Sequence, residues 1–176
     1  DFKGALEIAV QISELHPQRS AGPMLQGDTL FEAGNARAAI DAYNRALEVE
    51  PASVLITKLF RAYRSVGEME TARQTLQDWL SDNPDDAAIR LVLATSDHSD
   101  GSQKTASDAY ERVLERAPNN FVALNNLAWV YFERGDERAL DLAKRAYDQA
   151  GRRPDVADTY GWMLVESGQI ERGVKI

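Results

Sequence analysis

The stretch that decides the fold is SVLITKLFRAYRSVGEMETARQTLQDWLSDNP, residues 53–84. Apolar residues in its first half follow the i, i+3, i+4, i+7 spacing of one helix face: Ile56, Leu59, Phe60 and Tyr63. The second half repeats the pattern with Ala72, Leu76 and Trp79. Gly67, between the halves, is typical of the left-handed residue that ends a helix, and Pro84 cannot continue one because it lacks an N–H. The stretch therefore predicts two amphipathic helices joined by a tight turn.

The same glycine and proline marks recur along the whole chain. Prolines at 17, 51, 84 and 118 are 34, 33 and 34 residues apart, and glycines at 34, 67, 101, 135 and 168 are 33, 34, 34 and 33 apart. A fixed period of this length indicates a repeated helix pair. It predicts helices over 1–15, 20–33, 36–49, 53–66, 69–82, 86–98, 103–116, 121–134, 137–150, 154–167 and 170–176. No stretch alternates with period two, so no strand is predicted, and short connections make neighbouring helices antiparallel.

The composition excludes several classes of protein. The chain has 176 residues, 44% of them hydrophobic, which is enough to bury a core and excludes a disordered tail. Its net charge of −8 has the wrong sign for an electrostatic nucleic-acid binder. Without cysteine there is no disulfide frame, zinc–thiolate site or thiol nucleophile. The longest apolar run, residues 127–132, is too short to span a membrane.

A two-helix repeat of about 34 residues with Gly, Ala, an aromatic residue and Pro in this phase resembles the tetratricopeptide repeat (TPR). In the repeat that begins at Ser20, the family pattern is carried by Gly27, Leu30, Gly34, Ala39, Tyr43, Ala46 and Pro51. The resemblance implies an all-α fold, a right-handed α–α superhelix of antiparallel helix pairs, truncated at both ends. It organises 1–176 as one array: a half repeat (1–17), repeats over 20–52, 53–86, 87–120 and 121–153, and a partial repeat (154–176).

The chain departs from the family pattern in two places. After Gly135 the match slips by one residue in the turn between the helices, so the following alanines come early. Asp97 replaces a large apolar residue, and we expect the helix that ends near His98 to be the loosest. An array normally ends in a capping helix with a polar outer face. Because this chain is expected to start and stop inside helices, we interpret it as part of a longer array whose ends can associate.

The segments 123–131 and 158–164 have a narrower likeness. They are similar to bacterial envelope TPR proteins, in particular to the TPR lipoproteins of the PEP-CTERM/exosortase system that accompany exopolysaccharide genes. This resemblance implies a secreted, lipid-anchored parent protein whose lipid-bearing cysteine would precede Asp1. It favours a location in the periplasm or at the outer membrane, with the cytoplasm as the alternative.

No residue pattern indicates an enzyme. Asp97, His98 and Ser99 have the residue types of a catalytic triad, but consecutive residues at a helix end do not converge on one reacting atom. The two histidines, His16 and His98, lie outside any two-histidine metal motif, and the glycines are not clustered into a phosphate loop. We therefore expect no catalytic residue, no metal and no cofactor.

In the TPR family, the first helix of each repeat lines a concave groove through positions 2, 5, 6, 9, 12 and 13, which we call the groove positions. Lys58, Arg61 and Arg64 occupy positions 6, 9 and 12 of one helix and form a basic stripe. One interpretation is a site for a carboxylate or an acidic peptide, which arginine can bind with two hydrogen bonds. The alternative is a solvated face in which Arg61 pairs with Asp28 of the preceding repeat.

A second feature of the groove is an aromatic and amide cluster: Asn125, Asn126, Trp129, Phe132 and Trp162. Two indoles one repeat apart, with amides beside them, suit an extended peptide or a partner helix, because aromatic residues often anchor interfaces. They would also suit a sugar chain, whose CH faces stack on indoles. The alternative is that Trp129 and Trp162 pack between repeats as part of the core.

The sequence thus predicts a non-catalytic scaffold that binds a protein or peptide in its groove, within a larger bacterial envelope or exopolysaccharide-associated protein. A carbohydrate-binding module is the second hypothesis. A structural spacer that self-associates end to end is the third. Neither nucleic acid nor a membrane span enters any of the three.

Overall fold

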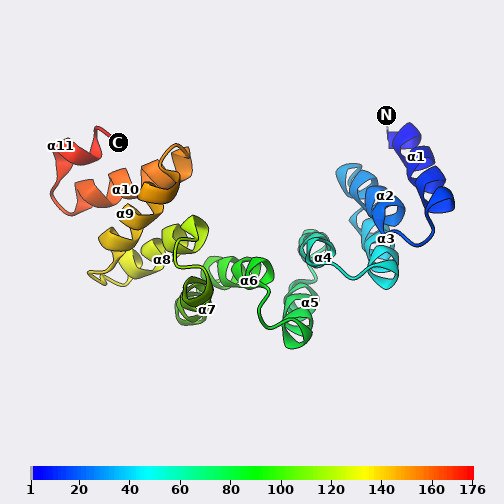
Figure 1. Cartoon of the computed structure of the whole chain (residues 1–176), viewed down its shortest axis with the longest axis horizontal. Helices are drawn as coiled ribbons and strands as arrows, with labels where there is room; N and C mark the ends of the chain where they lie inside the picture. The colour runs from blue at the N-terminus through cyan, green and yellow to red at the C-terminus, as the bar shows by residue number, and fades with distance from the viewer. Residues whose placement is uncertain (1) are drawn as a thin grey trace. The chain divides into compact units, whose positions relative to one another are not determined.

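A computed structural model describes residues 2–176, and within that range the chain forms eleven helices and no strand (Figure 1). They are α1 (Phe2–Leu15), α2 (Ala21–Glu32), α3 (Ala36–Val49), α4 (Ser53–Ser65), α5 (Met69–Asp82), α6 (Ala87–Ser99), α7 (Gln103–Arg116), α8 (Phe121–Glu133), α9 (Ala139–Ala150), α10 (Pro154–Glu166) and α11 (Ile170–Gly173). The all-α class is confirmed. All but two helices begin and end within one residue of the predicted bounds; Asp1 lies outside the described residues.

The corner inside each helix pair is the same structure every time. Gly34, Gly67, Gly101, Gly135 and Gly168 have φ between 67° and 83°. At Gly67, the glycine N–H donates to the carbonyl of Arg64, and the next N–H donates to the carbonyl of Tyr63. This pair of bonds satisfies the last carbonyls of α4 and requires a residue that adopts positive φ at no steric cost. The periodic glycines therefore end the first helix of each pair, as predicted.

Helix α9 begins at Ala139, two residues after the predicted start at 137. The Asp136 carboxylate accepts the backbone N–H of Arg138 at 3.0 Å and also binds its guanidinium at 2.7 Å and 2.9 Å. These bonds hold residues 136–138 in a turn that is not helical, so the helix begins only after them. The one-residue slip in the repeat pattern after Gly135 has this turn as its structural counterpart.

Helix α11 ends at Gly173, although the predicted helix runs to 176. Beyond Gly173 the backbone continues with two i→i−3 bonds, from Lys175 to Arg172 and from Ile176 to Gly173, which are typical of a tighter turn. Gly173 also lies against α10, where a Cβ on it would be 2.5 Å from the carbonyl oxygen of Gly161. The glycine that allows this close approach is a poor helix former, which explains the early end.

The chain divides into two compact units, one ending at Ile89 and the other beginning at Arg90. In the first unit, α3 and α4 supply a core cluster: Ala39, Ile40, Tyr43, Ala46, Leu55, Leu59 and Ala62. In the second unit, the largest fully buried apolar side chains belong to α7, α8 and α10, and they include Tyr110, Leu124, Met163 and Leu164. Each unit thus buries the facing sides of successive helices.

Small residues allow the helices of a pair to approach closely. A Cβ added at Gly27 on α2 would lie 2.4 Å from two ring carbons of Tyr43 on α3. The Tyr43 ring is only 2% exposed, so it has no room to move aside. Ala39, Ala72 and Ala106, each five residues after a corner glycine, are fully buried. Residue volume at these positions therefore sets the distance between helices.

We expect Gly27→Ala to destabilise the protein by about 1–3 kcal/mol, because its methyl group overlaps the Tyr43 ring. The sign of this stability change is informative. In an unconstrained helix interior, replacing glycine with alanine stabilises by about 0.8–1.0 kcal/mol, so a loss of stability indicates the overlap. Urea unfolding followed by circular dichroism measures the change. In a Tyr43→Leu background the cost of Gly27→Ala should disappear; an equal cost in both backgrounds would contradict the close-approach account.

Candidate protein-binding site

Trp129 connects two repeats of the second unit. Helix α8, which carries it, begins where the Asn120 side chain accepts the backbone N–H of Ala123 at 3.0 Å. The Trp129 Nε1–H donates to Thr159 Oγ1 on α10 at 3.0 Å, and Phe132 meets the indole edge-on, with ring centroids 5.8 Å apart. Trp129 is half-buried, so it packs against the next repeat and keeps part of its surface open.

Trp162 on α10 is 52% exposed and shares a cavity of about 770 Å³ with Trp129. We call this cavity the aromatic pocket; its lining is Trp129, Asp155, Ala157, Asp158, Thr159, Gly161, Trp162, Val165, Gly173, Val174 and Ile176. Several α10 residues in this lining occupy groove positions of their repeat. Asp155 is at position 2, Asp158 at 5, Trp162 at 9 and Val165 at 12. The pocket therefore combines groove positions of α8 and α10 with residues of the segment 173–176.

The two asparagines of the predicted cluster lie outside the pocket lining. The Asn126 side-chain amide donates to the hydroxyl of Tyr110 on α7 at 3.3 Å, so it fastens α8 to α7. The Tyr110 hydroxyl donates in turn to Thr95 Oγ1 at 3.1 Å, and burial raises its pKa. The Asn125 Oδ1 is buried and accepts no hydrogen bond from the described residues. The structure thus groups Trp129 with Phe132 and Trp162, and neither asparagine belongs to the pocket lining.

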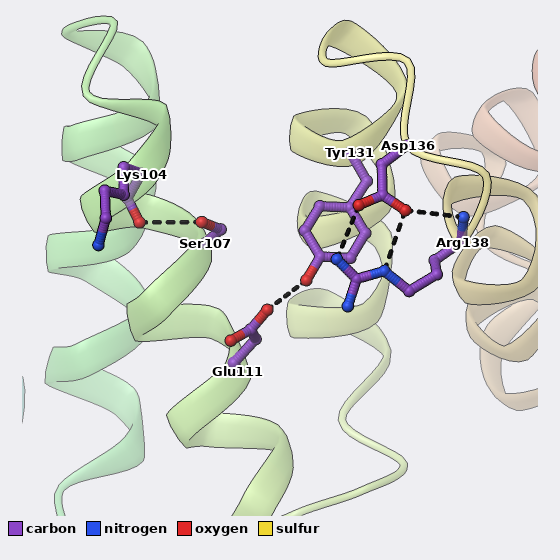
Figure 2. A network of polar contacts seen from close by, with 6 residues as sticks. All are labelled: Lys104, Ser107, Glu111, Tyr131, Asp136 and Arg138. Carbon is purple, nitrogen blue, oxygen red and sulfur yellow. Dashed lines mark hydrogen bonds and ion pairs between the residues drawn. The ribbon is translucent and has the colours of Figure 1, made fainter.

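A network on the opposite side of α8 holds the helix in place (Figure 2). The Tyr131 hydroxyl donates to the Glu111 carboxylate of α7. The Arg138 guanidinium lies over the Tyr131 ring, 4.2 Å from its centroid, while it binds Asp136. Burial, together with the Glu111 carboxylate, raises the pKa of Tyr131 to about 12. These contacts connect α7, α8 and the turn before α9, and so position the backbone that presents Trp129.

The basic stripe lies in the first unit, and its charges already have partners. Lys58 Nζ is 2.6 Å from Asp28 Oδ1, which also accepts the Tyr43 hydroxyl at 2.8 Å. It is Lys58, not Arg61, that the structure places on Asp28. Arg61 lies over the Phe31 ring at 5.6 Å from its centroid. Arg64 lies over the Phe60 ring at 5.5 Å from its centroid.

These groups enclose a smaller, polar hollow of about 220 Å³ lined by Asp28, Phe31, Glu32, Tyr43, Lys58 and Arg61. Burial and the hydrogen bond to Asp28 raise the pKa of Tyr43, so its hydroxyl stays protonated and donating. An acidic ligand here would have to displace Asp28 from Lys58 or bind the exposed side of Arg61. Sequence reasoning missed Thr159, Asp155 and Asp158, although their groove positions could have indicated them.

The side chains of Asp97, His98 and Ser99 have different surroundings. His98 Nε2 faces Glu133 at 3.2 Å, Ser99 Oγ donates to the Thr95 carbonyl at 2.9 Å, and Asp97 is fully buried. Within residues 2–176, no three His, Asp or Glu side chains are grouped to hold a metal ion. In the same range, no helix combines the length and apolar character needed to cross a membrane.

Antiparallel helix pairs with a glycine corner every 33 or 34 residues define a helical-repeat protein. Two family models, both described as tetratricopeptide repeat, match residues 30–95 and 109–140, which together make up more than half of the chain. The chain belongs to the tetratricopeptide repeat family. This fold supports a protein–protein interaction scaffold, and proteins of the family are typically non-catalytic.

Several solved structures have a similar fold. MamA has a TM-score of 0.67 and 21% sequence identity, over 85% of this chain and 88% of MamA. TTC0263, a thermophilic TPR protein of Thermus thermophilus, has a TM-score of 0.66 and 16% identity, over 89% of this chain and 87% of TTC0263. YrrB, a TPR protein with an unusual peptide-binding site, has a TM-score of 0.63 and 19% identity, over 88% of this chain and 81% of YrrB. Identities this low show the fold alone.

We expect Tyr131→Phe to lower stability near neutral pH by about 1 kcal/mol, because the hydrogen bond to Glu111 is lost. The raised pKa means that the folded state favours the protonated phenol. The contribution of the protonated Tyr131 phenol to folding stability is complete below the unfolded pKa of about 10. It is lost as the pH rises through the folded pKa of about 12. The stability gap between wild type and Tyr131→Phe should therefore narrow across this range in urea unfolding. A gap that stays constant would contradict the assignment.

Proposed function

We propose that this chain is a non-catalytic scaffold that binds a segment of another protein on the first helices of its repeats, with the aromatic pocket as the principal contact. One observation carries the proposal: an indole that is 52% exposed stands in a cavity of about 770 Å³ at groove positions. Large exposed apolar side chains in a concave site are unusual in a protein without a ligand there. Tryptophan is also among the residues that most often dominate binding energy.

The structure of the pocket suits a protein segment in two ways. Trp129 is held by Thr159 and Phe132, so one indole is fixed before a ligand arrives. A fixed aromatic residue loses little conformational entropy on binding, which favours affinity. YrrB, which has the same fold, is described as having a peptide-binding site, and this supports a peptide as the ligand class.

The wider setting that we propose is a bacterial envelope protein associated with exopolysaccharide, in the periplasm or at the outer membrane. Its support is the sequence likeness of residues 123–131 and 158–164 to TPR lipoproteins of the PEP-CTERM system. The precursor's N-terminus tests it: a leader that ends in a lipid-accepting cysteine is expected. Recovery of the full-length protein in the cytoplasmic fraction would contradict the proposed envelope location.

A carbohydrate ligand is the second candidate, because an exposed indole such as Trp162 can stack on the CH face of a sugar. Oligosaccharides should then change the tryptophan emission, and the change should be lost in Trp162→Ala. An emission spectrum that stays unchanged at millimolar sugar would exclude this ligand.

Self-association is the third candidate, supported by exposed apolar residues such as Val174 and Ile176, and is tested by light scattering over a dilution series.

We expect Trp129→Ala and Trp162→Ala to weaken binding of a peptide selected from a random display library by about thirtyfold, the loss typical of an aromatic side chain that a ligand covers. Fluorescence anisotropy measures the affinity. Val49→Ala is the matched control, because Val49 is an exposed apolar residue of α3, the second helix of its pair, and lies outside the pocket. Arg61→Glu tests the basic stripe in the first unit. Equal affinity for all folded variants would show that the peptide binds elsewhere.

A further inference from the structure

The aromatic pocket contains carboxylates but no cation. Its lining includes Asp155 and Asp158 and neither lysine nor arginine. Asp155 is partly neutralised, because Arg153 lies 3.1 Å away and holds the pKa of that carboxyl below its usual range. Asp158 is exposed and makes no hydrogen bond or ion pair with the described residues. The pocket therefore presents one carboxylate whose charge is not compensated by a neighbour.

The tryptophans of the pocket also differ from five aromatic residues of this protein whose ring faces are covered by a cation. Elsewhere in residues 2–176, a lysine or arginine of the chain lies over the ring face of Phe31, Tyr43, Phe60, Phe121 and Tyr131. Neither Trp129 nor Trp162 has such a cation among the described residues. Tryptophan attracts a cation more strongly than phenylalanine or tyrosine does. The tryptophan rings are thus the ones best suited to bind a cation, and no lysine or arginine of the described residues covers their faces.

Asp158 and Trp162 lie four residues apart on α10, a spacing that puts two side chains on the same face of a helix. A positive group on this face can approach the indole and the carboxylate together. Val165, Val174 and Ile176 supply an apolar wall beside them. The arrangement matches a side chain that combines an apolar stem with a charged end, as lysine and arginine do.

We propose that the aromatic pocket binds a partner-protein segment that carries a lysine or arginine next to an apolar residue, with the cation between Trp162 and Asp158. This inference rests on the proposed function and adds the charge of the ligand. The net charge of −8 favours the approach of a positive segment over long distances. An acidic segment would instead bring like charges to Asp155 and Asp158, which lowers its affinity.

The test uses two short amphipathic peptides of leucine and alanine, one with lysine on its polar face and one with glutamate at the same positions. Binding to the full chain is measured by fluorescence anisotropy of labelled peptide. We expect the lysine peptide to bind at least about tenfold more tightly than the glutamate peptide. Asp158→Asn should weaken the lysine peptide about three- to tenfold, and Asp158→Lys should reverse the preference. Higher salt should reduce the difference.

Two control variants separate specific contacts from general effects. Glu115→Gln removes an exposed carboxylate of α7 that makes no hydrogen bond or ion pair with the described residues, and it should leave both affinities unchanged. Trp162→Phe keeps an aromatic face and should retain more affinity for the lysine peptide than Trp162→Ala does. Circular dichroism confirms that each variant is folded before its affinity is compared.

Each outcome decides between the charge inference and the proposed function. Equal affinity for both peptides, lost in Trp162→Ala, would overturn the cationic inference and leave the pocket as an apolar docking site. Binding of neither peptide also overturns the inference, while the display-selected peptide continues to test the proposed function. Dimerisation that Trp162→Ala abolishes would assign the pocket to a second copy of the chain and overturn the inference as well.

Discussion

The structure depends on the dry contact between one helix and the next, which is possible only where side chains are small. The Tyr43 ring packs directly against Gly27. At Gly161 and Gly173, the backbones of α10 and α11 contact each other without any side chain between them. No helix pair of this length buries enough apolar surface alone, so stacking provides the stability. The close contacts also fix the register of each helix against its neighbour, which decides which side chains are left at the groove positions.

The site follows from this register. Trp129 reaches Thr159 on α10 because α8 and α10 are neighbouring first helices in a stack. Behind α8, the contacts of Tyr131 with Glu111 and Arg138 hold the same helix from its other side. Helix α8 is therefore held on two sides, and Trp162, one repeat later, stands at the position equivalent to Trp129 with more than half of its surface open.

Most of the fold could be predicted from the sequence because glycine and proline act locally. A corner that needs positive φ has few alternatives to glycine, so the ends of the first helices were visible in the spacing alone. The start of α9 was not visible, because it depends on how Arg138 folds back onto Asp136. The early end of α11 depends on the contact of Gly173 with α10, which no local pattern expresses.

The face of the site could be predicted from groove positions, but the depth of the pocket and the pairing of Lys58 with Asp28 could not. Both depend on distances between helices.

The identical glycine corners also bear on how such a chain can change over time. Each corner closes with the same two hydrogen bonds and contacts nothing beyond its own helix end at the glycine Cβ position. Duplication or deletion of a whole period would therefore leave every remaining corner intact, and would add or remove one first helix with its own set of groove positions. Recombination between corners can therefore change the number of helix pairs while the hydrogen bonds at each remaining corner stay the same.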